Sequence, residues 1–313
     1  MAKYALGIDI GAQTAKLGIV DEMGGILSRV VIPTNDTESA DEFIDALAAA
    51  AKGLINEASV AVEGIGVGAP NGNFYTGEIA FAPNLTWVKD SVVPFSAMLS
   101  RRMGGLKVTL TNDANAAAVG EMTYGVAKGM KNFIMITLGT GVGSGIIVNG
   151  ELLYGSDGFA GELGHVCAVR GGRRCGCGRD GCLEAYCSAI GAAKTACEML
   201  EMSDEESLLR GKEGITSKDV YEAAKAGDAL ALRVFDFTGK ILGRTLADFV
   251  AFSAPEAFVF FGGLARSREF LEKPIEEAMN ANLMNIWKGK VKILFSTLKE
   301  FDAAILGASA LGW

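Results

Sequence analysis

A strand–turn–strand pattern with glycine in its turn occurs twice in this chain, at positions far apart in the sequence. The first copy covers residues 7–21, where the apolar strand GIDI leads through a turn into a second strand, and a Glu22–Gly25 turn follows. The second copy covers residues 133–150 and ends in the hairpin signal Asn149-Gly150. A widely spaced internal repeat of this kind predicts a fold made of two related lobes.

Between and after these copies, apolar strand-like stretches alternate with helical stretches. Such alternation is typical of α/β folds, in which ligands bind where strands end and glycine turns begin. The pattern predicts strands over residues 63–69, 107–111, 133–138, 145–148, 257–261 and 291–295. It predicts helices over 38–56, from Pro94, from Ala114, several within 184–252, from Ser267 and from Phe301.

The chain has 313 residues, half of them apolar, and a net charge of −8. Nucleic acid is excluded as the main partner because no basic stripe is available to displace phosphate counterions. The N-terminus lacks the apolar run of a signal peptide, and four glycines between residues 139 and 145 argue against a membrane span there. We therefore expect a cytoplasmic protein without membrane or nucleic-acid partners, whose six cysteines are reduced.

Two glycine turns, at Gly11–Thr14 and Gly139–Gly143, are candidates for holding a nucleoside triphosphate. Glycine lets backbone N–H groups approach phosphate oxygens without a Cβ in the way. The pair Gly262-Gly263, at the end of a strand, is suited to packing against a base or ribose. The alternative for each turn alone is a tight hairpin that needs glycine only for its geometry. The phosphate-binding loops of other nucleotide-using enzyme classes, Gly-x4-Gly-Lys-Ser/Thr and His-Arg-Asp, do not occur in the sequence.

Asp9 lies inside an apolar strand just before the first glycine turn. An unpaired charge in such a place is costly, so we expect a cation beside it. The functional interpretation is a magnesium ion on the nucleotide phosphates, bound through water. The alternative is a buried aspartate that is satisfied by hydrogen bonds.

The only histidine, His165, and three cysteines, Cys175, Cys177 and Cys182, supply one nitrogen and three sulfurs within a short stretch rich in glycine. This is the ligand set of a closed tetrahedral zinc site. Four protein ligands leave no open position, so we expect a structural zinc ion held by a loop over residues 165–184. The remaining cysteines are expected to be core thiols: Cys167, Cys187 and Cys197.

Glu162 precedes the predicted zinc loop and Glu184 stands at its end. Folding around the metal is expected to bring the two carboxylates together. With the free ring nitrogen of His165 they would form a receptor for adjacent hydroxyl groups of a sugar. The alternative for each glutamate is a solvated surface charge.

Asn112 and Asp113 stand at the junction between the strand at 107–111 and the following helix. We expect Asp113 to accept the proton of an attacking hydroxyl, because phosphoryl transfer depends mainly on positioning and charge neutralisation, and an ordinary carboxylate suffices. The alternative is that either residue serves only as the helix N-cap.

Taken together, these motifs resemble those of the ROK family (repressor, open reading frame, kinase) of the actin-like sugar kinase superfamily, over essentially the whole chain. The matching stretches are Asn-Asp at 112–113, LGTGVGSGII at 138–147, Glu-Leu-Gly-His at 162–165 and CGCGRDGCLE at 175–184, and APNLTW at 82–87 resembles glucokinase-like members. The resemblance implies an α/β, two-lobed actin-like ATPase (ribonuclease H-like) fold with a small zinc-binding loop. It implies an N-terminal lobe of residues 1–112 plus 303–313 and a C-terminal lobe of residues 113–302.

By the same resemblance, Asp113 is the base toward the 6-hydroxyl of a hexose, and Asn112 binds neighbouring hydroxyls. Glu162, His165 and Glu184 bind the far side of the ring, on a wall fixed by zinc. The residues implied for the ATP cleft are Gly11, Thr14, Thr140, Gly141, Gly262 and Gly263. The resemblance also implies ATP, catalytic Mg²⁺ and structural Zn²⁺ as cofactors, and a homodimer or homotetramer.

Two positions depart from the family pattern. The first loop has Ala12-Gln13 where the family has Gly-Thr, with Thr14 one place later, which predicts altered phosphate contacts and allows a lower rate. After the strand at 63–69, Asn71 follows proline where glycine is usual, and it is placed to reach the sugar and alter the preference.

The predicted function is ATP-dependent phosphorylation of a hexose at the 6-hydroxyl, with glucose first and fructose, mannose or an N-acetylhexosamine as alternatives. A second hypothesis is a sugar-responsive regulator, since the family contains repressors with the same zinc motif. Those repressors carry a DNA-binding segment before the first meander, for which a meander starting at residue 4 leaves no room. The third hypothesis is a sugar sensor of low activity, which the altered first loop allows.

Overall fold

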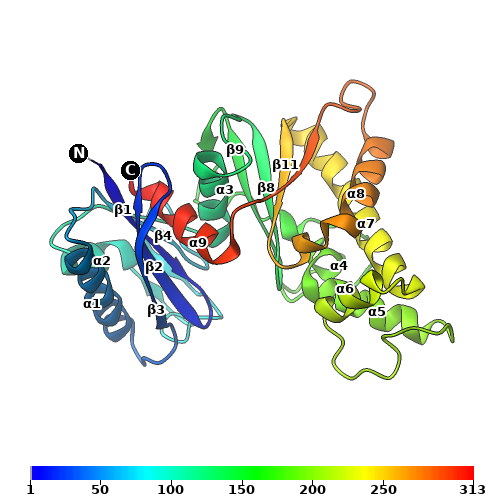
Figure 1. Cartoon of the computed structure of the whole chain (residues 1–313), viewed down its shortest axis with the longest axis horizontal. Helices are drawn as coiled ribbons and strands as arrows, with labels where there is room; N and C mark the ends of the chain where they lie inside the picture. The colour runs from blue at the N-terminus through cyan, green and yellow to red at the C-terminus, as the bar shows by residue number, and fades with distance from the viewer. Residues whose placement is uncertain (1) are drawn as a thin grey trace. The chain divides into compact units, whose positions relative to one another are not determined.

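The computed structural model describes residues 2–313, except the side chains of residues 300 and 301 (Figure 1). The chain divides into two compact units. Unit 1 comprises the chain up to Lys131, residues 145–160 and Thr297–Trp313, whereas unit 2 comprises Asn132–Ser144 and Gly161–Ser296. The expected lobe boundary at residue 112 stays a prediction; the helix that follows it belongs to unit 1.

A five-stranded sheet in the order β3-β2-β1-β4-β7 forms the core of unit 1. β2 pairs antiparallel with both β1 and β3, and β4 pairs parallel with both β1 and β7. Residues 7–21 therefore form the predicted meander opening. The strands are β1 (Tyr4–Ile10), β2 (Thr14–Asp21), β3 (Ile26–Pro33), β4 (Ile65–Gly68) and β7 (Val108–Thr111).

The second sheet has the order β10-β9-β8-β11-β12. β10 is antiparallel to β9, and β11 runs parallel to both β8 and β12. The two sheets thus share one strand order, which confirms the repeat inferred from the two glycine turns. The strands are β8 (Phe133–Leu138), β9 (Val142–Val148), β10 (Glu151–Leu152), β11 (Ala257–Phe261) and β12 (Lys292–Phe295).

β9 begins at Val142, three residues before the predicted start, so the second glycine turn is shorter than predicted. The hydrogen bond from Gly139 N to Gly141 O, 3.0 Å long, closes this turn. Glycine within the strand has a packing reason at Gly145, where a Cβ would lie 2.6 Å from the Cβ of Ala118. At least one glycine of this stretch therefore lies in a strand and allows a neighbouring helix to pack closely against it.

The helices of unit 1 cover the sheet, whose core is built from Leu, Ile, Val and Phe side chains. α1 begins where the Ser39 hydroxyl accepts the backbone N–H of Glu42. The helices are α1 (Ala40–Ala58), α2 (Phe95–Arg102), α3 (Asp113–Tyr124) and α9 (Glu300–Ser309). A short two-stranded sheet, β5 (Ile79–Ala80) with β6 (Val92–Val93), was not predicted from the sequence.

The last helix, α9, lies directly on the unit 1 sheet because the sheet presents glycines to it. A Cβ on Gly7 would lie 2.2 Å from Ile305 O, and one on Gly66 would lie 1.9 Å from Ala308 O. α9 also meets α3 through glycines, since a Cβ on Gly120 would lie 2.7 Å from the Cα of Gly307. The C-terminal segment thus packs against the first strands of the chain.

Unit 2 is largely helical beyond its strands (Figure 1). The long helix α7 packs on α8 through Gly243, where a Cβ would lie 2.3 Å from Ile275 O. This close approach explains glycine inside a helix, where it otherwise costs stability. The helices are α4 (Glu184–Cys187), α5 (Ala189–Glu201), α6 (Ser217–Lys225), α7 (Ala229–Ser253) and α8 (Arg268–Asn282).

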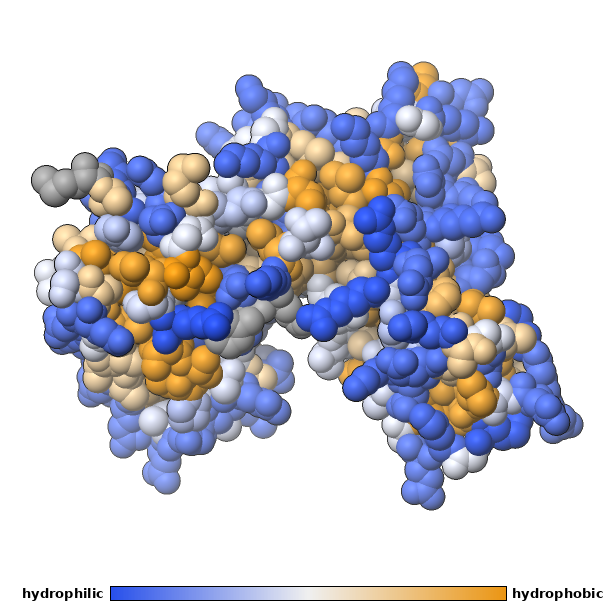
Figure 2. Space-filling view, viewed as in Figure 1, coloured by the Kyte–Doolittle hydropathy of each residue, from blue (hydrophilic) through white to orange (hydrophobic). Residues whose placement is uncertain are grey.

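Hydrophilic residues cover most of the face shown in Figure 2, and hydrophobic residues gather in separate patches on it. Across residues 2–313, no helix combines the length and the apolar composition that crossing a bilayer requires.

Candidate functional site

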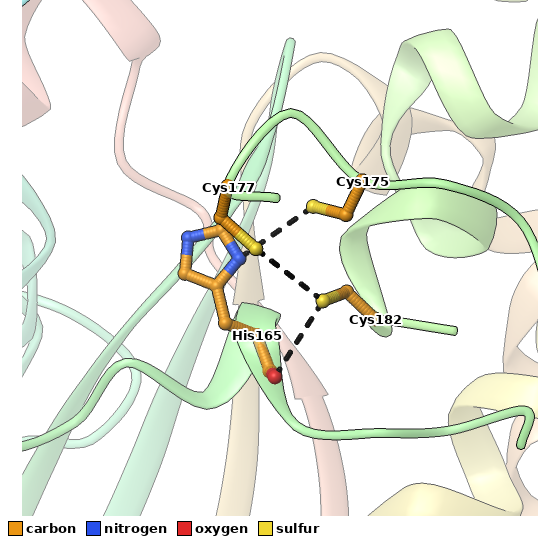
Figure 3. A group of neighbouring side chains, drawn as sticks. All are labelled: His165, Cys175, Cys177 and Cys182. Atoms are coloured by element: carbon orange, nitrogen blue, oxygen red, sulfur yellow. Dashed lines mark hydrogen bonds between the residues drawn. The ribbon is translucent and has the colours of Figure 1, made fainter. Parts of the chain in front are cut away.

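The ligand atoms of His165, Cys175, Cys177 and Cys182 converge on one point in unit 2 (Figure 3). All four atoms lie within 4.8 Å of one another. Cys177 Sγ is 3.6 Å from Cys182 Sγ, and Cys175 Sγ is 3.8 Å from His165 Nδ1. A tetrahedral zinc ion with Zn–S bonds of about 2.3 Å would separate its sulfurs by roughly 3.8 Å. The donor set therefore fits zinc in number, type and spacing.

Nδ1 of His165 faces the sulfurs, so Nε2 is the ring nitrogen left for another partner. Burial raises the pKa of Cys182 to about 12, because a buried thiolate without a cation is costly. A bound divalent cation would offset that cost. The geometry thus supports both the ligand set and the free imidazole nitrogen predicted from the sequence.

Short-range turns shape the loop around this cluster. Gly178 N donates to Cys175 O (3.0 Å), and Cys175 N donates to Arg179 O (2.9 Å). Gly181 adopts a left-handed φ of +76°, and a Cβ there would lie 1.8 Å from Val169 O, so only glycine fits. These turns bring cysteines that are close in sequence to one point.

Arg173 ties the loop to α5, a role that the sequence did not reveal. Its Nε donates to Glu198 Oε1 (3.1 Å) and its Nη2 to Thr195 Oγ1 (2.9 Å). The guanidinium also lies 4.5 Å from the ring centroid of Tyr186. Only 8% of the Arg173 side chain is exposed, against 69% for its neighbour Arg174, and nothing in the run GGRRC distinguishes the two.

Glu184, the first residue of α4, lies between the metal cluster and the second glycine turn. Its Oε2 accepts the backbone N–H of Val142 (3.0 Å), and its Oε1 is 3.6 Å from Cys175 Sγ. A Cβ on Gly141 would lie 2.3 Å from Glu184 Oε2. His165 and Glu184 therefore meet at Cys175, whereas the expected approach of Glu162 to Glu184 stays a prediction.

Glu162 is exposed at the start of the short turn η1 (Leu163–His165). That turn is fixed by Ser144, a buried residue that the sequence analysis did not identify. Ser144 Oγ donates to Gly161 O and accepts the N–H of Leu163. Glu162 thus begins the same turn that delivers His165 to the metal cluster.

The three cysteines outside the cluster differ from one another. Cys187 is buried, as predicted, and Cys197 is half-buried. The prediction of a core thiol is wrong for Cys167, which is exposed because it lies in the loop rather than on a helix.

The first glycine turn, in unit 1, is held by a local backbone hydrogen bond and by one side chain that lies farther along the sequence. Gly11 N donates to Thr14 O (3.0 Å), and Asn35 Nδ2 donates to Ala12 O (2.7 Å). Ala12 and Gln13 are exposed. Asn35, which the sequence analysis did not identify, fixes the turn that departs from the family pattern.

Asp9 is paired with Lys16, a residue that the sequence analysis did not identify. The two stand opposite each other in the β1–β2 register, and Lys16 Nζ lies 3.7 Å from Asp9 Oδ2. Burial raises the pKa of Asp9 to about 6, Lys16 lowers it, and the charge of Asp113 raises it. The expected cation beside Asp9 is therefore in part a lysine of the same sheet.

Gly68 brings Asp113 near Asp9. It pairs with Asp9 across β1 and β4, and a Cβ on Gly68 would lie 3.5 Å from the Cα of Asp113. The N-cap of α3 is Asn112, whose Oδ1 accepts the N–H of Asn115 (2.7 Å). The capping alternative thus holds for Asn112, and Asp113 is the first helical residue.

The carboxylate of Asp113 accepts the N–H of Ala114 (2.9 Å) through Oδ1. Asp113 keeps solvent-exposed surface although protein surrounds its carboxylate. That surrounding protein raises its pKa, and the hydrogen bond from Ala114 opposes the rise. A carboxylate with a raised pKa at a helix start is suited to accepting a proton from a hydroxyl.

Asn71 has a left-handed φ of +53° and donates through Nδ2 to Ala80 O (3.0 Å) and Phe81 O (3.1 Å). Its turn packs on the end of β7, because a Cβ on Gly72 would lie 2.6 Å from Thr111 O. The turn therefore lies beside the Asn112 cap, with the Asn71 amide group committed to backbone carbonyls.

Thr140 and Gly263 each line a cavity in unit 2. The cavities have volumes of about 470 Å³ and 400 Å³, and both include Ser217 in their linings. Gly262, just before Gly263, has a φ of +104° and approaches Leu138 O closely. The glycine pair and the second glycine turn thus border neighbouring hollows that α5 and α6 also line.

The predicted site residues form two sets. Unit 1 holds Asp9, Gly11, Thr14, Asn71, Asn112 and Asp113. Unit 2 holds Thr140, Gly141, Glu162, His165, Cys175, Cys177, Cys182, Glu184, Gly262 and Gly263.

Comparison with known proteins identifies the family of this chain. A glucokinase of Halalkalibacterium halodurans is 37% identical, over 99% of this chain and 94% of its own. A glucokinase of Thermotoga maritima is 34% identical, over 98% of this chain and 96% of its own. The structure of a ROK family glucokinase from Streptomyces griseus, in complex with glucose and AMPPNP, superposes with a TM-score of 0.80 at 34% identity and covers 99% of both chains. Residues 5–312 match the ROK family, and the chain belongs to it.

Proposed function

We propose that this protein is an ATP-dependent hexokinase that phosphorylates the 6-hydroxyl of a hexose, with glucose as the preferred sugar. The observation that carries the proposal is the full-length similarity to glucokinases, one of them solved with glucose and AMPPNP. The placement of Asp113 at the exposed start of α3, beside a cap supplied by Asn112, supports it.

Asp113 is the proposed catalytic base. Its Oδ1 is held by the N–H of Ala114, which orients the carboxylate and leaves Oδ2 to take the proton of the 6-hydroxyl. Because its pKa is raised, Asp113 accepts a proton from the hydroxyl more favourably than an ordinary surface aspartate does. Most of the rate enhancement would still come from holding the hydroxyl in line with the γ-phosphate.

Sugar contacts are proposed for residues of each unit, taken separately. Glu162, Glu184 and Nε2 of His165 would bind hydroxyls on one part of the ring. Asn112 would donate from Nδ2, because its Oδ1 is used as the helix cap. Asn71 would accept through Oδ1, since both donors of its amide are already bound to carbonyls.

The nucleotide would be bound by the two glycine turns and the glycine pair: Gly11, Thr14, Thr140, Gly141, Gly262 and Gly263. Its nucleoside part would occupy the hollows lined by Thr140 and Gly263. Asp9 would hold the water shell of a magnesium ion, which neutralises phosphate charge when it is bound. Lys16, paired with Asp9, keeps that carboxylate oriented.

The metal cluster is proposed to hold one structural zinc ion through His165, Cys175, Cys177 and Cys182. All four ligands come from the protein, so the ion would have no position for water or substrate. Its proposed role is to hold His165 and Glu184 in place. We also propose a homodimer or homotetramer, as the family resemblance implies.

The function is tested by incubating the protein with MgATP and each of glucose, fructose, mannose and N-acetylglucosamine, and measuring ADP release. ³¹P and ¹³C NMR of the product locate the phosphate. We expect ADP and glucose 6-phosphate in equal amounts. Asp113→Asn is expected to abolish most activity, whereas Asp236→Asn, a surface change in an exposed ion pair on α7, is expected to leave it intact.

If the protein binds glucose but forms no ADP from ATP with any of these sugars, the kinase proposal is contradicted and the sugar-sensor hypothesis is favoured. Activity that survives in Asp113→Asn would contradict the assignment of the base alone.

A further inference from the structure

Cys167 and Cys182 stand opposite each other at the base of the zinc loop, where they form an isolated antiparallel bridge. Ala168 N donates to Gly181 O (2.8 Å), and Leu183 N donates to Val166 O (2.9 Å). These two bonds flank the cysteine pair without using a backbone group of either cysteine. This is the non-hydrogen-bonded type of antiparallel pair, in which the Cα atoms are about 4.5 Å apart and both side chains lie on one face.

That Cα separation lies within the range of roughly 4.4–6.8 Å that a disulfide spans. The sulfur of Cys167 already lies over the neighbouring backbone, because a Cβ on Gly181 would be 3.4 Å from it. Cys167 does not belong to the ligand cluster and is exposed, whereas Cys182 is a fully buried member of it. An accessible thiol is therefore within disulfide reach of one metal ligand.

We propose that Cys167 is a redox-active thiol that forms a disulfide with Cys182 and thereby dismantles the metal cluster. A hydroperoxide would first oxidise Cys167 to the sulfenic acid, with one oxygen transferred to sulfur and water (or an alcohol) released. The Cys182 sulfur would then attack the Cys167 sulfur and expel hydroxide, which takes up a proton to become water. The two thiols lose two electrons in total, the peroxide gains them, and the zinc ion leaves as Zn²⁺.

The consequence follows from the contacts of the cluster, and it rests on the proposed zinc and sugar roles. Without Cys182, only Cys175, Cys177 and His165 remain as ligands. Cys175 is the residue at which His165 and Glu184 meet, so loss of the ion would release both. Oxidation is therefore expected to weaken glucose binding without touching Asp113.

The test treats purified zinc-loaded protein with hydrogen peroxide and follows two readouts, neither of which is enzyme activity. A chromogenic zinc chelator measures metal release. Tryptic peptides analysed by mass spectrometry identify the disulfide, because cleavage after Arg170, Arg174 and Arg179 places Cys167, the Cys175–Cys177 pair and Cys182 on different peptides. Fragmentation separates Cys182 from Cys187, which shares its peptide.

We expect a peptide linked between Cys167 and Cys182, about 2 Da lighter than the sum of its reduced parts, with one zinc ion released per disulfide. Cys167→Ser should lose the linked peptide and release zinc more slowly. Cys197→Ser, a half-buried thiol outside the cluster, is the matched control and should behave as the wild type.

Equal rates of zinc release from the wild type and Cys167→Ser, with linkage only among Cys175, Cys177 and Cys182, would overturn the proposal. Elemental analysis of the protein as purified separates this inference from the zinc proposal. A Cys167–Cys182 disulfide formed by peroxide in protein that is purified without zinc would support the thiol pairing and refute only the metal.

Discussion

The two sheets of this protein have the same strand order, and each follows its first strand with a glycine turn, yet the turns are supported in different ways. The first turn, Gly11–Thr14, lies among groups carried by strand ends and helix starts, namely Asp9, Lys16 and Asp113. The second, at Gly139–Gly141, is buttressed by Glu184, which belongs to a metal loop inserted after the meander. One scaffold, used twice, thus carries the proposed reaction chemistry on its own strand ends in one copy and the proposed sugar-binding groups on an insertion in the other.

We expect the stability of this inserted loop to depend on the buried guanidinium group of Arg173. Replacing Arg173 by Met should lower the free energy of unfolding of unit 2 by about 2–4 kcal/mol, because Glu198 and two backbone carbonyls lose their donor. Arg174→Met, next to it and exposed, should change it by no more than about 0.5 kcal/mol. Urea unfolding of both variants checks this, and equal effects would show that the loop does not rest on Arg173.

Removing one metal ligand should separate the two regions functionally. Cys175→Ser is expected to lose the zinc ion and raise KM for glucose by about 10- to 100-fold, since His165 and Glu184 meet at this sulfur. Elemental analysis and glucose saturation curves measure the two effects. A variant that retains one zinc ion per chain and full glucose affinity would disprove the role given to the loop.

Two glycines of the second turn offer a matched pair. Gly141→Ala would place a Cβ 2.3 Å from Glu184 Oε2, so we expect a cost of about 1–3 kcal/mol and a raised KM for glucose. Gly139→Ala meets no atom within 4 Å among the glycine's described surroundings and should be tolerated. Thermal unfolding and glucose kinetics of the pair report the difference. If both variants behave alike, the link between this turn and Glu184 is wrong.

The first region should show a pH dependence of stability that comes from Asp9. The pKa of Asp9 is raised from 3.8 to about 6, so the folded state favours the protonated form. Stability from Asp9 is fully present below pH 3.8 and is lost as pH rises through about 6, a change of about 3 kcal/mol at most. In magnesium-free buffer, Asp9→Asn should remove the part of the decline in unfolding free energy that comes from ionisation of Asp9. Urea midpoints between pH 4 and pH 7 measure it, and parallel curves for both proteins would contradict the assignment.

Patterns that are local in sequence predicted most of the fold. Hydrophobic alternation and glycine turns predicted the strands and helices within a few residues, and cysteine spacing predicted which four residues form the cluster that could hold a metal. Side chains that bind distant backbone groups were not predictable, as with Asn35 on Ala12 O and Ser144 on Gly161 O. Nor was Lys16, whose pairing with Asp9 depends on strand register.

The glycines of the turns were interpreted as places where backbone N–H groups meet phosphate, and the neighbours that some of them have in the structure were not predictable. Gly141 was assigned to phosphate, and its close neighbour here is Glu184. Nothing in the sequence indicated a packing role for Gly7 and Gly66, although their lack of a side chain allows the last helix to lie on the sheet. Such contacts depend on which elements pack together, and a single sequence does not encode that locally.

The division of labour between the two regions is tested most directly by steady-state kinetics of Asp113→Asn and Glu184→Gln with glucose and MgATP. We expect Asp113→Asn to lower kcat by about 10²- to 10⁴-fold with KM for glucose near the wild-type value. Glu184→Gln should instead raise KM for glucose and leave kcat largely unchanged. The opposite split, or equal changes in kcat for both variants, would contradict the account.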